Sequence, residues 1–249
     1  MDGHNFPNIA LMKLSAWHKR RGDTVEFADP AARRYDKVYM SKVFTFSRDC
    51  TDRYDCEVVR AGTGYRDYAT ILPEEIEHIC PDYSLYGVKE AYGFLTRGCV
   101  NRCSWCVVPY KEGEVRAHAD IEEFLDGHKH AVLLDNNVLA SEWGLMQIEK
   151  IVDIQLADVR ARLAKERMTL AITPAAKQML AVGGLDPVFG ARPLKRLVQR
   201  EVVDAIAAAI IDGTVREGDQ VTVDVDKDGG FTVACDNTPA ATYEVPDAE

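Results

Sequence analysis

Hydrophobic positions in the first part of the chain form short runs separated by polar links. Where these runs keep helical spacing, they predict helices over residues 7–21, 72–79 and 119–125. Where they alternate or run continuously, they predict strands over residues 24–27, 37–40, 92–96 and 130–135. Because short links join helices to strands, residues 1–85 are interpreted as a doubly wound α/β layer that lacks its first strand.

The pattern changes from Glu142 onward. Apolar residues keep helical spacing as far as about Glu166, which is longer than the helix of a βα unit usually runs. A strand, a capped helix, a loop, a long helix and a strand pair follow, at residues 168–172, 173–181, 184–193, 194–211, 220–225 and 231–234. We therefore expect an α/β first half, a small α+β domain over residues 147–235 and a disordered acidic tail at 236–249.

Charge and cysteine content narrow the classes of function. The net charge of −10, from 30 basic and 40 acidic residues, argues against nucleic-acid binding, which usually rests on a basic surface. No apolar run approaches the roughly 20 residues of a membrane span, and the N-terminus has no signal-peptide pattern. We therefore expect no nucleic-acid or membrane partner and a cytoplasmic location. Thiols stay reduced there, so clustered cysteines indicate metal or redox ligands rather than disulfides.

Three thiols lie close together in a glycine-led segment that has no helical spacing. Cys99, Cys103 and Cys106 are arranged as Cys-x₃-Cys-x₂-Cys, and the segment is predicted to be a loop. Three interpretations are open: reduced core cysteines, a zinc site with His118 or His128 as its fourth ligand, or a [4Fe–4S] cluster with one iron left free.

The same segment resembles the signature of the radical S-adenosylmethionine (radical SAM) family. The resemblance rests on the three cysteines with Trp105 just before the last of them, on the preceding strand 92–98 and on the following strand 132–137. It implies that the three cysteines hold a [4Fe–4S] cluster whose open iron binds S-adenosyl-L-methionine. It also implies that residues 86–146 carry the first βα units of a radical SAM barrel.

The resemblance places further residues near that cofactor. Trp105 would lie near its adenine, with a packed aromatic side chain as the alternative, and Asn136 and Asn137 would contact its methionine group at the end of a strand. Two parallel strands cannot close a barrel. Residues 86–146 are therefore a truncated core, and we expect no catalysis unless another chain completes the barrel.

Residues from about 148 to 235 resemble a different family, the C-terminal small domain of ClpB-type AAA+ disaggregases. The resemblance rests on segments 151–156, 170–177 and, above all, 184–196. It implies that Arg192 is the sensor-2 arginine, which contacts the phosphates of ATP; a salt bridge at a helix start is the alternative. These 249 residues contain no P-loop, so we expect no ATPase site of their own.

The leading functional hypothesis is a [4Fe–4S]-binding radical SAM-like fragment, catalytically incomplete, fused to a chaperone small domain. The alternative is a ClpB-type small domain that serves as the subunit-interface module of an ATP-dependent disaggregase. In that family the small domain packs against a neighbouring subunit, so the resemblance implies a protein partner or a homo-oligomer. A third possibility is a chain with no evolved function of its own.

Overall fold

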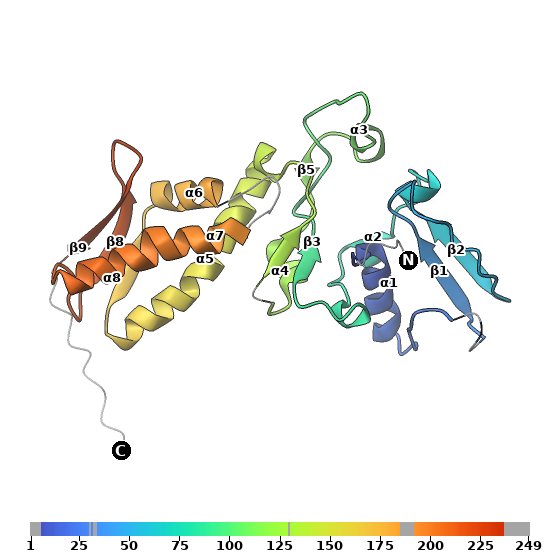
Figure 1. Cartoon of the computed structure of the whole chain (residues 1–249), viewed down its shortest axis with the longest axis horizontal. Coiled ribbons are helices and arrows are strands. Elements are labelled where there is room, and N and C mark those ends of the chain that lie inside the picture. The colour runs from blue at the N-terminus through green and yellow to red at the C-terminus, as the bar shows by residue number, and fades with distance from the viewer. Residues whose placement is uncertain (1–5, 30, 32–33, 129, 185–191, 237–249) are drawn as a thin grey trace, which may run out of the picture. The chain divides into compact units, whose positions relative to one another are not determined.

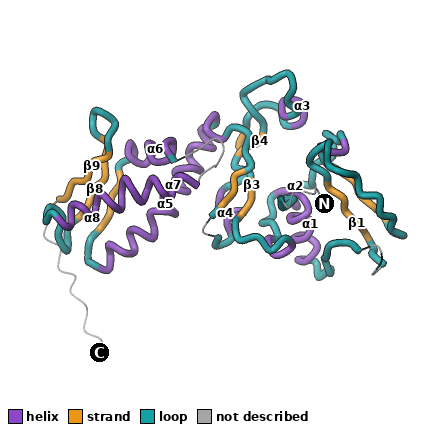
Figure 2. The backbone as a smooth tube through the Cα atoms, in the orientation of Figure 1, coloured by secondary structure: helices purple, strands orange, loops and turns teal. Residues whose placement is uncertain are grey.

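The computed structural model describes residues 6–29, 31, 34–128, 130–184 and 192–236. The chain divides into two compact units, Met1–Gly144 and Leu145–Glu249 (Figure 1). Figure 2 shows that loops connect short elements in the first unit, whereas helices make up most of the second. The tail predicted at 236–249 lies outside the described residues except for Asp236, which is the last residue of a strand, and most of the loop predicted at 184–193 also lies outside them. None of the described helices is both long and apolar enough to span a membrane.

The first unit opens with a helix packed beside a small parallel sheet. Helix α1 (Ile9–Arg20) begins where the Asn8 side chain accepts a hydrogen bond from a backbone N–H of the first turn. Strands β1 (Lys37–Ser41) and β2 (Glu57–Ala61) pair in parallel. This mixed character confirms the α/β expectation, while the described residues form no doubly wound layer.

The strand predicted at residues 24–27 is wrong. This segment has no ladder of backbone hydrogen bonds, and the ring of Phe27 instead packs edge-on against Tyr86 at 5.1 Å between centroids. The apolar side chain of Phe27 is therefore packed against another aromatic ring, and the segment does not pair with a neighbouring strand. The helix predicted at 72–79 is shorter, α2 (Glu74–Glu77), and lies against α1.

The second part of the first unit is a βα unit with parallel strands. Strand β3 (Ala91–Gly93) pairs with β6 (Ala131–Leu133), and α4 (Ile121–Leu125) packs on β3. The contact is close because β3 ends in a glycine: a Cβ at Gly93 would lie 2.5 Å from the ring of Phe124. The expected βα unit is thus confirmed, while the described strands of this unit pair only two by two and close no barrel.

The strand predicted at 92–96 is broken in the structure. After β3 the chain turns, and β4 (Thr96–Arg97) pairs in antiparallel fashion with β5 (Arg116–Ala117). At the break the carboxylate of Asp135 accepts the backbone N–H groups of both Leu95 and Thr96. Consecutive N–H groups of a regular strand point to opposite sides, so one carboxylate can accept both only where the strand is interrupted. Helix α3 (Val108–Lys111) lies between β4 and β5 in the chain.

The second unit packs helices on a three-stranded sheet. Its elements are α5 (Glu142–Lys165, which begins in the first unit), β7 (Thr169–Ile172), α6 (Pro174–Gly183), α7 (Arg192–Val198), a π-helical segment (Gln199–Val203), α8 (Asp204–Ile211), β8 (Gln220–Val225) and β9 (Phe231–Asp236). Strand β8 is central, parallel to β7 and antiparallel to β9. The predicted helix 194–211 is therefore present, with a π turn inside it.

The core of the second unit follows the apolar spacing of its helices and strands. Its most buried side chains, all at most 2% exposed, include Ile148, Val152, Leu156, Leu180, Leu194, Val202, Ile206, Val221 and Val223. Helix α6 is capped by Thr173, whose hydroxyl accepts the N–H of Ala176 and donates to Asp224 on β8. The strand and helix predicted at 168–181 are thereby confirmed and anchored to the sheet.

Candidate functional site

The cysteine segment forms a loop between β4 and α3, and a glycine fixes its entry. Gly98 has φ of 84°, and a Cβ there would lie 2.1 Å from the carbonyl oxygen of Glu114. Only glycine adopts this conformation freely and allows so close a backbone approach. The N–H of Cys99 then donates to the carbonyl of Gly113 at 3.2 Å, which ties the start of the loop to its end.

The structure brings two of the three cysteines to one cavity. Cys99 and Cys103 line a cavity of about 430 Å³ together with Tyr110, and Cys106 is not among its lining residues. All three thiols are free and half-buried. Among the described residues, no group of three or more His, Cys, Asp or Glu side chains is arranged to hold a metal ion. The three-thiolate ligand set therefore stays a prediction.

The two histidines considered as zinc ligands have other contacts. Nε2 of His118 lies 3.1 Å from Oε1 of Glu77, without the geometry of a hydrogen bond. Nδ1 of His128 lies 3.0 Å from the carbonyl oxygen of Leu125, and its ring packs against Tyr83. The zinc interpretation thus gains no fourth ligand from either histidine.

The residues expected near S-adenosylmethionine lie on the surface of the first unit. The side chain of Trp105 is 87% exposed, so the alternative of a packed aromatic is wrong. Asn136 is exposed after the end of β6, and its amide donates to the carboxylate of Glu112 at 3.3 Å. Asn137 is half-buried at the start of a short 3₁₀ turn. Their roles toward the cofactor stay predictions.

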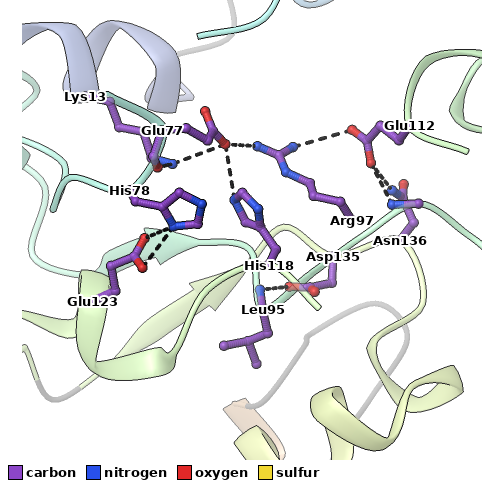
Figure 3. A network of polar contacts seen from close by, with 11 residues as sticks. Lys13, Glu77, His78, Leu95, Arg97, Glu112, His118, Glu123, Asp135 and Asn136 are labelled. Carbon is purple, nitrogen blue, oxygen red and sulfur yellow. Dashed lines mark hydrogen bonds and ion pairs between the residues drawn. The ribbon is translucent and has the colours of Figure 1, made fainter. Parts of the chain in front are cut away.

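A partly buried polar network lies beside the cysteine loop, and sequence reasoning missed it. We call it the Glu77 network; its members are Lys13, Glu77, Arg97, Glu112 and His118 (Figure 3). The carboxylate of Glu77 contacts Nη2 of Arg97 at 2.6 Å and Nζ of Lys13 at 3.3 Å, and Lys13 also donates to the backbone carbonyl of Glu77. Lys13 is only 5% exposed, so these contacts replace water around its charge.

Arg97 extends this network to the loop itself. Nη1 of Arg97 lies 3.4 Å from Oε1 of Glu112. Oε2 of Glu112 accepts a hydrogen bond from the backbone N–H of Gly98 at 3.0 Å. The guanidinium also stacks over the ring of Phe94 at 3.6 Å. The network therefore joins helices α1 and α2 to the entry of the cysteine loop.

Charge, burial and pKa are coupled in this region. Burial alone would raise the pKa of Glu77, but the neighbouring His118 and the two cations outweigh it and hold the pKa well below its usual range. Burial lowers the pKa of Lys13, with Glu77 opposing the shift. Burial also raises the pKa of the Asp135 carboxyl, against the hydrogen bonds from Thr96 and Leu95.

The network was missed because its members are far apart in sequence. Glu77 lies in the first turn of the short helix α2, where negative charge is favourable on local grounds alone, so its position in the sequence does not indicate a distant partner. One residue in the sequence pointed to the network. Lys13 lies among apolar positions of the α1 helix, and a cation buried there needs an anionic or polar partner. Its partner, 64 residues further along the chain, is visible only in the fold.

The second unit brings together segments that carried its family resemblance. Nζ of Lys177 on α6 forms an ion pair with Asp153 on α5, so segments 151–156 and 170–177 meet directly. Arg192 is the first residue of α7, and its side chain lies outside the described part of the structure, as do residues 185–191. Its sensor-like role stays a prediction.

Comparison with known proteins concerns this second unit above all. Residues 145–223 match the family described as the C-terminal, D2-small domain, of ClpB protein. Proteins named "Chaperone protein ClpB" are similar to the chain. That of Corynebacterium efficiens is 34% identical over 177 residues, 68% of this chain and 21% of the relative. That of Corynebacterium glutamicum is 44% identical over 173 residues, 66% and 20% respectively. That of Mycobacterium bovis is 48% identical over 82 residues, 33% and 10% respectively.

These findings support a ClpB-type chaperone domain in the second unit. The matches to the two Corynebacterium relatives cover about two thirds of this chain. They cover only about a fifth of the length of each relative. Those two matches are longer than residues 145–249 alone, so they extend into the first unit. The radical SAM resemblance of the first unit gains no support from these comparisons and stays a prediction.

Proposed function

We propose that the second unit acts as a subunit-interface module of the ClpB D2-small type, which binds a neighbouring chaperone subunit and hydrolyses no ATP itself. The observation that supports this most is the family match over residues 145–223, which falls within one compact unit. This unit has an apolar core of its own, to which α5, α6, α7, α8 and β8 contribute buried side chains.

The surface of this unit offers apolar side chains to a partner. Val182 near the end of α6 is 49% exposed, and Ile210 and Ile211 at the end of α8 are 40% and 84% exposed. Large apolar side chains at helix ends are suited to burial against another subunit, because their removal from water stabilises the complex. Ile211 is the most exposed of the three.

The proposal predicts that the chain binds a ClpB assembly through the apolar end of α8, where Ile210 and Ile211 are exposed. Purified full chain is mixed with the ClpB protein of Corynebacterium glutamicum in the presence of ATP, and binding is measured by sedimentation velocity. We expect saturable co-sedimentation, weakened at least about tenfold by Ile211→Asp, because a charge then replaces an apolar contact. The matched control is Ile71→Asp, which alters an isoleucine of the first unit that is 78% exposed.

Two outcomes would contradict the proposed interface. One is binding that Ile71→Asp weakens as much as Ile211→Asp does. The other is neither co-sedimentation nor self-association of the chain at micromolar concentration. Measurable ATP turnover by the chain alone would overturn the statement that it has no ATPase site.

For the first unit we propose a second function, binding of a [4Fe–4S] cluster by Cys99, Cys103 and Cys106. Two observations favour it: all three thiols are free, and Cys99 and Cys103 line the same cavity. Thiolates are the usual ligands of such clusters. Three ligands would leave one iron open to S-adenosyl-L-methionine, with Trp105 beside the last ligand and Asn136 and Asn137 as candidate contacts. Because the described strands of this unit close no barrel, the proposal is cluster binding without turnover.

Anaerobic reconstitution with iron and sulfide tests this proposal. We expect a brown protein whose bound iron falls by at least half in Cys103→Ala, because only two thiolate ligands remain. Cys235→Ala is the matched control, since that cysteine is also free and half-buried but lies in the second unit, and it should leave the iron content unchanged. Unchanged iron in Cys103→Ala would rule out the assignment.

A further inference from the structure

Two of the loop cysteines lie at the two ends of one tight turn. The N–H of Cys106 donates to the carbonyl oxygen of Cys103 at 3.1 Å, and Ser104 and Trp105 form the turn between them. A β-turn holds its first and fourth Cα atoms within about 7 Å. A disulfide usually joins Cα atoms about 4.4–6.8 Å apart. The backbone therefore already holds this pair close to the separation that a disulfide needs.

The third thiol of the loop lies outside this turn. Sγ of Cys99 accepts the N–H of Asn101 at 3.4 Å, and the backbone of Cys99 is tied to Gly113 across the loop. Its neighbour Gly98 is held by Glu112 and has no space for a side chain. Cys99 thus belongs to the fastened base of the loop, whereas the other two cysteines share its turn.

The turn is open to a reagent in solution. Trp105 is 87% exposed, Ser104 is also exposed, and the two flanking cysteines are half-buried. In thiol–disulfide exchange a thiol of the protein attacks a disulfide that arrives from solution, and an exposed turn permits this contact. The thiols of Cys103 and Cys106 are both free in the structure.

We propose that Cys103 and Cys106 form a reversible dithiol–disulfide pair, which glutathione disulfide closes when no metal is bound. One cysteine attacks glutathione disulfide, which forms a mixed disulfide and releases one glutathione. The second cysteine attacks the mixed disulfide, which forms the Cys103–Cys106 bond and releases a second glutathione. The pair loses two electrons and two protons, and glutathione disulfide gains them as it becomes two glutathione thiols. A dithiol reductant reverses the reaction.

This pair goes beyond the interface proposed for the second unit and does not depend on it. The disulfide and the proposed cluster exclude each other, because closing the pair removes two of the three thiolates proposed to hold the cluster. A chain with the pair closed cannot be reconstituted with iron until it is reduced. The turn would therefore couple metal loading to the thiol redox state.

Peptide mapping tests the pairing directly. The full chain is stripped of metal with a chelator, reduced, desalted without oxygen, exposed to glutathione disulfide, quenched in acid, alkylated and digested with trypsin. Cleavage after Arg102 and Lys111 leaves Cys99 in peptide 98–102 and both turn cysteines in peptide 103–111. We expect peptide 103–111 without alkylation and two hydrogen atoms lighter than its reduced form, while peptide 98–102 is alkylated.

Three serine variants and one internal reference sharpen this result. Cys103→Ser and Cys106→Ser should leave glutathione attached to the remaining turn cysteine, whereas Cys99→Ser, the matched control, should still close the pair. Cys235 has no partner in a tight turn and serves as the reference thiol. We expect half of the Cys103–Cys106 pairs to close at a glutathione disulfide concentration at least about tenfold lower than the concentration that modifies half of Cys235. The reason is that the second step of pair closure occurs within one chain.

Two results would overturn the proposal. The first is a cross-link between peptides 98–102 and 103–111, which would mean that Cys99 is a partner. The second is a turn pair that remains fully alkylated where Cys235 already carries glutathione. Both results are read from the wild-type chain, so they stand even if a variant fails to fold.

Discussion

Replacing Glu77 with glutamine is expected to destabilise the first unit by about 3–5 kcal/mol at neutral pH. Glutamine keeps the size of the side chain but removes the negative charge that faces Lys13 and Arg97. Lys13 is 5% exposed and Arg97 is 18% exposed at its side chain, so water has little access to replace the lost carboxylate. Removing one partner of a buried ion pair costs more than the pair contributes, because an uncompensated charge is left behind.

The effect should depend on pH in a definite direction. The pKa of Glu77 lies below its usual range in the folded protein, so this carboxyl contributes stability above the pKa of the unfolded chain, about 4.3 for glutamate. That contribution is lost progressively as the pH falls below this value. The difference between wild type and Glu77→Gln should therefore be full at pH 7 and should shrink below about pH 4.

Hydrogen exchange followed by mass spectrometry measures this loss in the full chain. Peptides from α1 and β1 report opening of the first unit, and those from β8 and β9 report the second unit as an internal reference. The control is Glu57→Gln, which removes an exposed ion pair with Lys37 and should change stability by less than about 1 kcal/mol. Equal effects of the two substitutions, or a pH-independent difference, would contradict the role assigned to Glu77.

Replacing Leu156 with alanine is expected to destabilise the second unit by about 2–5 kcal/mol. Leu156 is fully buried in the middle of α5, and its loss removes apolar contacts and leaves a cavity in the core. The same exchange measurement should show faster exchange in β7–β9 and α6, with the β1 and β2 peptides unchanged.

A neighbouring residue on the same helix provides the control for Leu156. Ile154 is 37% exposed, so Ile154→Ala removes a similar volume from a site that water already reaches. Its expected cost is below about 1 kcal/mol. If both substitutions weaken the second unit equally, the effect belongs to helix propensity, and the core assigned to α5 is wrong.

Sequence reasoning predicted the second unit better than the first, for a physical reason. The elements from 142 to 234 are long and strongly periodic, so burial of one face decides their structure locally. In the first unit, strands of two to five residues depend on distant partners. The segment 24–27 had the alternation of a strand but no strand to pair with, and Phe27 found a ring partner instead.

The candidate site shows the same division between local and distant causes. The cysteine loop was predicted because its glycine and its thiols are adjacent in sequence. The break between β3 and β4 was not predicted, because it involves Asp135, which lies 39 residues after Thr96. The Glu77 network was missed for the same reason: each of its contacts joins residues at least 15 positions apart.

The π turn between α7 and α8 has a consequence for which changes of length the second unit tolerates. The buried residues Leu194, Val198, Val202 and Ile206 recur every four positions. In an uninterrupted α-helix each such step turns the side chain by about 40°, so the last residue would face about 120° away from the first. The extra residue held in the π turn compensates for most of that rotation.

This spacing makes the helix sensitive to insertion and tolerant of deletion. Removing Arg200, whose side chain is 70% exposed, would convert the spacing of buried residues from four-four-four to four-three-four. That is the spacing that a regular α-helix uses to keep one apolar face. The segment from Leu194 to Ile206 is therefore one residue longer than a regular α-helix requires. An inserted residue would need a second π turn to keep the buried residues on one face, and the described residues of this helix contain one π turn only.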